Sequence, residues 1–182
     1  MAQPTDSNIE SVTQHWTADL TTRSGTPVKI RPVNRTDRAL IEDFFEHAST
    51  DDLRFRFLTS LRHLDEPKID ALCAIDPPTR ISFLAFCEGQ LAAIGTLAGD
   101  KDRNKAEIAL CTRPEWKRHG VSWVVFDHII RFARAHHYQE IISIEKTDNR
   151  AALQMEREMG FELSLEDDDG GEMIASKPTV LG

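Results

Sequence analysis

The pattern of hydrophobic and polar positions divides the chain into helices and strands. Hydrophobic residues that recur every three or four positions indicate helices, and short alternating or continuous runs indicate strands. The pattern predicts helices over residues 34–48, a short segment after Ser49 or Thr50, 64–75, 120–137 and 148–159. It predicts strands over residues 16–22, 28–33, 81–87, 91–97, 105–112, 138–146, 161–165 and 172–176.

The residues between the predicted strands indicate how those strands pair. Ser24-Gly25 separates the first two strands and favours a hairpin. Short turns at residues 88–90 and 99–104 separate the next three strands, so we expect an antiparallel meander. Strands and helices then alternate to the end. This order predicts an α+β domain with one central, mostly antiparallel sheet flanked by helices.

The chain has 182 residues, of which 40% are hydrophobic, enough for one domain with a substantial core. Residues 1–14 are largely polar and are expected to form a flexible N-terminal segment, which leaves residues 15–182 as a single domain. The first residues lack the apolar run of a signal peptide, and no stretch is long enough to span a bilayer. We therefore expect a soluble, cytoplasmic protein.

Charge and cysteine usage narrow the range of partners. The formal net charge is −8, and an acidic surface disfavours both nucleic acid and anionic membranes but tolerates a cationic substrate. Three widely spaced cysteines indicate neither a disulfide framework nor a zinc site, which fits a reducing compartment. His136-His137 and the acidic run at 166–169 are interpreted as solvated groups, so no metal is expected. The sequence does not fix an oligomeric state.

The segment from Arg113 to Ser122 has the design of an anion site. A strand stops at Pro114, a short basic stretch follows, and Gly120 precedes a long apolar helix. The first turn of a helix offers unpaired N–H groups and a partial positive charge, which suit a diphosphate. Gly120 allows close approach of the backbone. From the residues alone, an ordinary strand-to-helix loop with solvated charges remains the alternative.

The six residues Lys117-Arg118-His119-Gly120-Val121-Ser122 resemble motif A of the GNAT N-acetyltransferases, Q/R-x-x-G-x-G/A, with Lys and Ser replacing the first and last positions. The later segment from Asn149 to Gly160-Phe161 resembles the closing motif of that family, although a simple capped helix also explains it. The resemblance implies the GNAT fold and acetyl-CoA as cosubstrate. It assigns the pyrophosphate to the backbone of 118–122 and the pantetheine arm to Asn149. The coenzyme is also expected to contact Ala109, Leu110 and Cys111.

Three further segments, at residues 28–33, 44–57 and 106–110, are similar to the catalytic module of bacterial Pat-type protein lysine acetyltransferases. The likeness covers about residues 25–165. It implies an acceptor amine on a protein lysine, with a small amine as the alternative. A non-catalytic acyl-CoA-binding sensor or interaction module on the same fold is a further alternative.

Acetyl transfer to an amine benefits from a base, because a lysine amine has a pKa of about 10.4 and is almost entirely protonated at pH 7. Glu107 is the candidate, since strand alternation separates it from Ala106 and Ile108 and allows it to face a cleft. The Pat resemblance implies the same residue. The alternative is a strand glutamate that faces solvent.

Protonation of the leaving thiolate and covalent catalysis by a cysteine have weaker support in the sequence. The family often protonates the leaving thiolate with a tyrosine, but Glu156 occupies that position and the only tyrosine, Tyr138, is interpreted as a packing residue. Water, or a protonated Glu156, remains as the donor. Cys111 lies in the strand of Glu107 and allows an acetyl-cysteine intermediate. A buried packing role is the favoured interpretation of Cys111.

Overall fold

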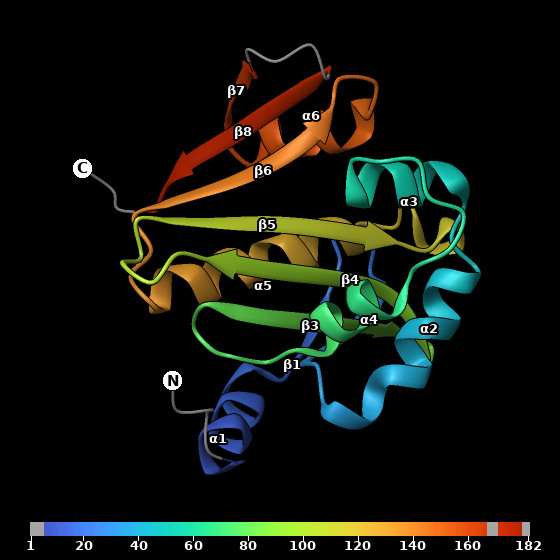
Figure 1. Ribbon diagram of the computed structural model, residues 1–182, viewed down its shortest axis with the longest axis vertical. Helices are drawn as coiled ribbons and strands as arrows, with labels where there is room; N and C mark the ends of the chain where they lie inside the picture. Colours follow the sequence, from blue (N-terminus) through green and yellow to red (C-terminus); the bar gives the residue numbers. More distant parts are fainter. Residues whose placement is uncertain (1–5, 167–170, 180–182) are drawn as a thin grey trace.

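The computed structural model describes residues 6–166 and 171–179 (Figure 1). The helices are α1 (Asp6–Trp16), α2 (Arg38–Glu46), α3 (Thr50–Phe57), α4 (Glu66–Cys73), α5 (Val121–Ala135) and α6 (Arg150–Glu158), with short 3-10 turns η1 (Arg35–Asp37) and η2 (Pro114–Trp116). The strands are β1 (Ala18–Thr21), β2 (Pro27–Pro32), β3 (Arg80–Cys87), β4 (Gln90–Gly99), β5 (Lys105–Thr112), β6 (Glu140–Lys146), β7 (Glu162–Leu165) and β8 (Glu172–Pro178).

The described strands form one sheet in the order β1-β2-β3-β4-β5-β6-β8-β7. The pair β5–β6 is parallel, and every other neighbouring pair within the described part of the chain is antiparallel. The expected hairpin and meander are both present. The sequence-based prediction of an α+β fold with a mostly antiparallel central sheet is therefore confirmed.

Helices cover both faces of the sheet. In Figure 1, α5 crosses behind the strands, whereas α3 and α4 lie on the near face. The apolar side of α5 is buried against β3, β4 and β5 and carries Val125, Ile129 and Phe132. A Cβ atom on Gly95 of β4 would lie only 2.4 Å from Cδ1 of Ile129, so glycine is needed for this close packing.

The N-terminal segment differs from the expectation. Residues 6–16 form α1, where the sequence indicated a flexible segment over 1–14 and a strand from Trp16; residues 1–5 lie outside the described part. The Trp16 ring packs on Phe132 and His128, with centroid distances of 5.0 and 5.7 Å. The Trp16 carbonyl also lies 3.1 Å from Nε2 of His128. These long-range contacts stabilise a helix whose own apolar pattern is sparse.

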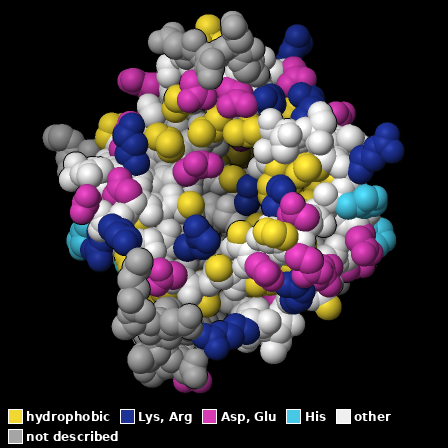
Figure 2. Space-filling model, viewed as in Figure 1, with side chains coloured by type: hydrophobic (Ala, Val, Ile, Leu, Met, Phe, Trp, Pro, Cys, Tyr) yellow, Lys and Arg dark blue, Asp and Glu magenta, His cyan; other side chains and the backbone are white. Residues whose placement is uncertain are grey.

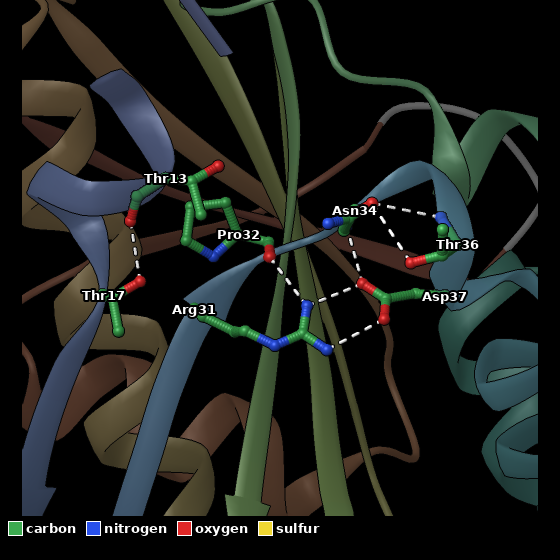
Figure 3. Close-up of polar contacts among 7 residues, drawn as sticks. All are labelled: Thr13, Thr17, Arg31, Pro32, Asn34, Thr36 and Asp37. Atoms are coloured by element: carbon green, nitrogen blue, oxygen red, sulfur yellow. Dashed lines mark hydrogen bonds and ion pairs between the residues drawn. The ribbon is translucent and has the colours of Figure 1, made fainter. Parts of the chain in front are cut away.

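Polar contacts fix the connection from β2 into the helical layer (Figure 3). Arg31 of β2 donates to both carboxylate oxygens of Asp37, at 2.6 and 2.8 Å. Asp37 also accepts the backbone N–H of Asn34 at 2.6 Å, and the Asn34 side chain accepts the N–H of Thr36 at 3.1 Å. This reciprocal capping box determines the direction in which the chain enters α2.

Helix caps confirm one expectation and correct another. Ser49 caps α3 through a capping box with Asp52, as expected. The last helix was expected to begin at residue 148, but it begins at Arg150 with Asn149 as the N-cap residue. Asp148 instead forms an ion pair with Arg54 of α3 at 2.8 Å.

Candidate functional site

The parallel strands β5 and β6 diverge, and the candidate site lies where they separate. Their register covers only Lys105–Glu107 of β5 against Glu140–Ile142 of β6. Past that point β5 pairs only with β4, and β6 pairs only with β8. Figure 1 shows the two strands opening toward α3. Backbone groups along both inner edges are therefore left without a strand partner.

A cavity of about 510 Å³ lies between the diverging strands, α3, α5 and α6. Six of the residues proposed from the sequence line it: Leu110, Cys111, Lys117, Arg118, Ser122 and Asn149. Ala109 lines a neighbouring cavity instead. His119 is exposed, Gly120 is the N-cap residue of α5, and Val121 is fully buried, so none of these three side chains lines the larger cavity.

The basic loop meets the cavity at the N-terminus of α5. Gly120 has φ of 81°, a left-handed conformation that glycine adopts without strain. The first intrahelical bond runs from the N–H of Val124 to the Gly120 carbonyl at 3.2 Å, so helix geometry leaves the preceding N–H groups without a carbonyl partner within the helix. Ser24 donates to the His119 carbonyl at 2.9 Å and anchors the loop to the β1–β2 turn. These features suit a diphosphate group.

Lys117 is held across the cavity mouth. Its ammonium group forms an ion pair with the buried carboxylate of Asp52 in α3, and both residues line the cavity. Asp52 also accepts the hydroxyl of Ser49 at 2.7 Å, which keeps the carboxylate oriented. The ion pair with Asp52 therefore holds the Lys117 side chain against α3 and keeps it from extending freely into solvent.

Two carboxyl groups lie at or beside this cavity: Glu145 is half-buried and Glu156 is fully buried. Glu145 of β6 accepts the side-chain N–H of Asn149 at 2.6 Å and the Ser143 hydroxyl at 3.3 Å. Burial raises the pKa of Glu145 to about 7, although both hydrogen bonds oppose the rise. Burial and the neighbouring Glu145 raise the pKa of Glu156 to about 8. Sequence reasoning missed Glu145, whose only signal was a polar position on the same strand face as Ser143.

Glu107 lines a second cavity, of about 300 Å³, on the sheet face that α3 and α4 cover. Ala106 and Ile108 are fully buried on the opposite face, in agreement with the predicted alternation. The same face of the molecule is hollowed near its centre, with acidic and basic side chains at the border of the hollow (Figure 2). Glu107 therefore faces a cavity rather than open solvent.

Arg56 of α3 lies where the two cavities approach each other. Its Nη2 donates to Oγ1 of Thr96 at 2.7 Å, while its Nε is buried without a hydrogen-bond partner among the described residues. Burial lowers the pKa of the guanidinium, and the nearby carboxyl groups of Glu107 and Glu145 oppose this fall. Arg56 is thus a cation that interacts with a carboxyl group of each cavity, Glu107 and Glu145. It was not singled out from the sequence, although it lies in the segment 44–57 that is similar to the Pat-type module.

The structure weighs against the acetyl-cysteine route. Cys111 lines the larger cavity, but burial raises the pKa of its thiol to about 12. The thiol therefore stays protonated at neutral pH, whereas a nucleophilic cysteine needs its thiolate. Tyr138 is fully buried and donates its hydroxyl to the Pro78 carbonyl at 3.0 Å, which agrees with a packing role.

The sequence also raised the histidine pair His136-His137 and the acidic run at 166–169 as groups to consider. Among residues 6–166 and 171–179, no cluster of three metal-ligating side chains occurs, and no helix is long and apolar enough to cross a membrane. His136 packs on Phe132 at a centroid distance of 4.3 Å, and burial lowers its pKa, so it is less solvated than expected. Most of the acidic run at 166–169 lies outside the described residues.

Comparisons with known proteins agree with this geometry. Residues 39–161 match the family described as the acetyltransferase (GNAT) family. Acetyltransferase PA5475 of Pseudomonas aeruginosa is 26% identical over 164 residues, which cover 88% of this chain and 87% of that protein. The GNAT domain of S. lividans PAT superposes with a TM-score of 0.84 at 19% identity, covering 90% of this chain and 97% of that one. The structure of yncA from Salmonella typhimurium, solved with its cofactor acetyl-CoA, superposes with a TM-score of 0.67 at 14% identity. The match covers 84% of this chain and 94% of that one.

The sheet has one diverging parallel pair and a basic helix start beside the opening, and the family match assigns this fold to the acetyltransferases. The family match spans more than half of the chain, from residue 39 to residue 161. The chain therefore belongs to the GNAT family and is an acetyltransferase.

Proposed function

We propose that this acetyltransferase moves the acetyl group of acetyl-CoA directly to a primary amine on a protein lysine, with Glu107 as the general base. The coenzyme occupies the larger cavity, and the acceptor amine enters through the cavity that Glu107 lines. Both substrates are bound together, so no acetyl-enzyme forms. The high pKa of the Cys111 thiol supports this direct route.

The basic loop and the start of α5 support the coenzyme assignment. Lys117 and Arg118 bring positive charge to the larger cavity, and the free N–H groups of the first helical turn point toward bound phosphates. His119, Gly120, Val121 and Ser122 contribute backbone groups to the same turn. The pantetheine arm then follows the open edge of β5, at Ala109, Leu110 and Cys111, and meets the Asn149 side chain.

The single observation that carries the proposal is the position of Glu107 relative to the coenzyme cavity. Glu107 lines one cavity and Leu110 lines the other, three residues further along β5. A strand rises by about 3.4 Å per residue, so the two positions are about 10 Å apart. An amine at Glu107 therefore lies a short distance along β5 from a thioester at the open edge of that strand.

The general base and the positioning of the two substrates contribute to the reaction rate in different ways. Glu107 takes a proton from the acceptor ammonium group, and the neutral amine then attacks the thioester carbonyl; base catalysis of this kind typically contributes about 10²–10⁴ in rate. Holding the amine and the thioester together contributes through orientation. The leaving thiolate takes a proton from water or from a protonated carboxyl group, of which Glu145 is the one that lines the coenzyme cavity.

An acceptor screen tests the proposed function. Thiol release from acetyl-CoA is followed with lysine-containing proteins and peptides and with small amines, and products are identified by mass spectrometry. Acetylation of lysine side chains is the expected result. If only small amines are acetylated, the acceptor is a small amine and not a protein lysine. Tight acetyl-CoA binding without transfer to any amine would instead indicate an acyl-CoA-binding sensor.

A further inference from the structure

The floor of the smaller cavity carries opposite charges at its two ends. Arg80 of β3, Ala98 of β4 and Glu107 of β5 are paired across the sheet in one row, and all three line the cavity. Neighbouring strands are about 4.8 Å apart, so the backbones at Arg80 and Glu107 are about 10 Å apart. A small residue lies between them, which leaves the space above the row open.

The walls of this cavity add further positive charge. Arg56 comes from α3 and Lys68 from α4, whereas Glu107 is the only carboxylate among the lining residues. Lys68 is paired with Asp65 at 2.9 Å. Neither Arg56 nor Arg80 forms an ion pair with any residue that the structure describes, and Arg80 is exposed to the cavity. The cavity is therefore locally cationic in a protein whose net charge is −8.

We propose that the smaller cavity selects an acceptor that carries an anionic group, a carboxylate or a phosphate, close to its primary amine. The amine lies at Glu107, and the anion lies at Arg80, on the far side of Ala98. Arginine binds planar anions through paired, charge-assisted hydrogen bonds, and the free guanidinium of Arg80 is available for them. This inference rests on the proposed function, because it takes the cavity of Glu107 as the acceptor cavity.

Two sources present this chemistry. A protein lysine with an acidic neighbour places a carboxylate about one or two residues away, at about 3.4 Å per residue in an extended segment. A free amino acid carries its own carboxylate. Both place an amine at Glu107 and an anion at Arg80. A lysine in a basic segment instead brings a second cation close to Arg80 and Arg56, which repel it.

Matched peptides test the proposal. Each contains one lysine with blocked termini, flanked by Glu, Gln or Arg, and free lysine is compared with the same amine lacking its carboxylate. We expect kcat/KM to be about tenfold higher for the Glu peptide than for the Gln peptide, and lowest for the Arg peptide. A higher value for free lysine than for any peptide would support the inference and identify a small-molecule source.

Arg80→Gln provides the matched variant, and Arg134→Gln the control, because Arg134 is exposed on α5 at the opposite face of the sheet. The preference for Glu should disappear in R80Q and persist in R134Q. Equal values for the Glu and Arg peptides, or a preference that survives in R80Q, would overturn the proposal.

A binding readout separates this inference from the proposed function. If no acceptor is acetylated, the proposed function fails, and anisotropy of the labelled peptides in the presence of CoA still reports on the cavity. Tighter binding of the Glu peptide that is lost in R80Q supports an anion-selective cavity. Equal binding of the Glu and Arg peptides refutes it.

Discussion

Two partly or fully buried carboxyl groups make the stability of the fold depend on pH. Burial raises the pKa of Glu145 to about 7 and that of Glu156 to about 8, whereas both titrate near 4.5 in an unfolded chain. Between those values the folded protein keeps protons that the unfolded chain releases. Their contribution to stability is therefore complete below about pH 4.5 and is lost as the pH rises through about 8.

Glu156→Gln removes one of these groups and keeps its shape. The amide stays neutral, so the variant should gain in Tm relative to the wild type as the pH rises from 5 to 8. A difference of about 1 kcal/mol shifts Tm by about 2–4 °C in a chain of this size, which calorimetry resolves. Glu162→Gln, at an exposed position of β7, is the control and should follow the wild type. The same pH profile in all three proteins would contradict the raised pKa of Glu156.

At the scale of elements, the start of α5 combines a left-handed backbone conformation with the proposed phosphate site. Gly120 has φ of 81°, and a Cβ atom there would lie 3.1 Å from Cβ of Thr22. Gly120→Ala should lose about 1–2 kcal/mol of stability, the typical cost of a left-handed alanine. It should also weaken acetyl-CoA binding, because the new methyl group disturbs the loop that is proposed to hold the pyrophosphate.

Gly25→Ala separates these two effects. Gly25 has φ of 89° and open space around its Cβ position, so it shares the left-handed backbone conformation without the crowding. Both variants should lower Tm, and calorimetric titration should show weaker acetyl-CoA binding in G120A alone. Equal losses of affinity in both variants would mean that the loop acts through general stability.

The same elements show how far sequence can predict this fold. The strand β5, the glycine before α5 and the Gly160 turn after α6 each have a local pattern, and all were predicted close to their observed bounds. The helix α1 was missed because its stability comes from the contact of Trp16 with Phe132, more than a hundred residues away. Asp148 was misassigned because Arg54 of a distant helix competes for it.

For the whole molecule, the site depends on one parallel strand pair within an otherwise antiparallel sheet. Divergence of β5 from β6 opens the larger cavity, proposed for the coenzyme, while Glu107 of β5 lines the second cavity. Motif spacing predicted Glu107 and Asn149 but not Arg56 or Glu145. These two become functional candidates only when α3 and β6 are brought to the same opening, which no local pattern encodes.

Replacement of Glu107 by glutamine tests the proposed mechanism most directly. The amide preserves the size of the side chain and removes the base, so kcat should fall by about 10²–10⁴. The Kd for acetyl-CoA, measured on the same preparation by calorimetry, should stay within a factor of about two, because Glu107 lines the other cavity. An unchanged kcat, or a loss of activity matched by an equal loss of acetyl-CoA affinity, would contradict the role of Glu107 as the general base.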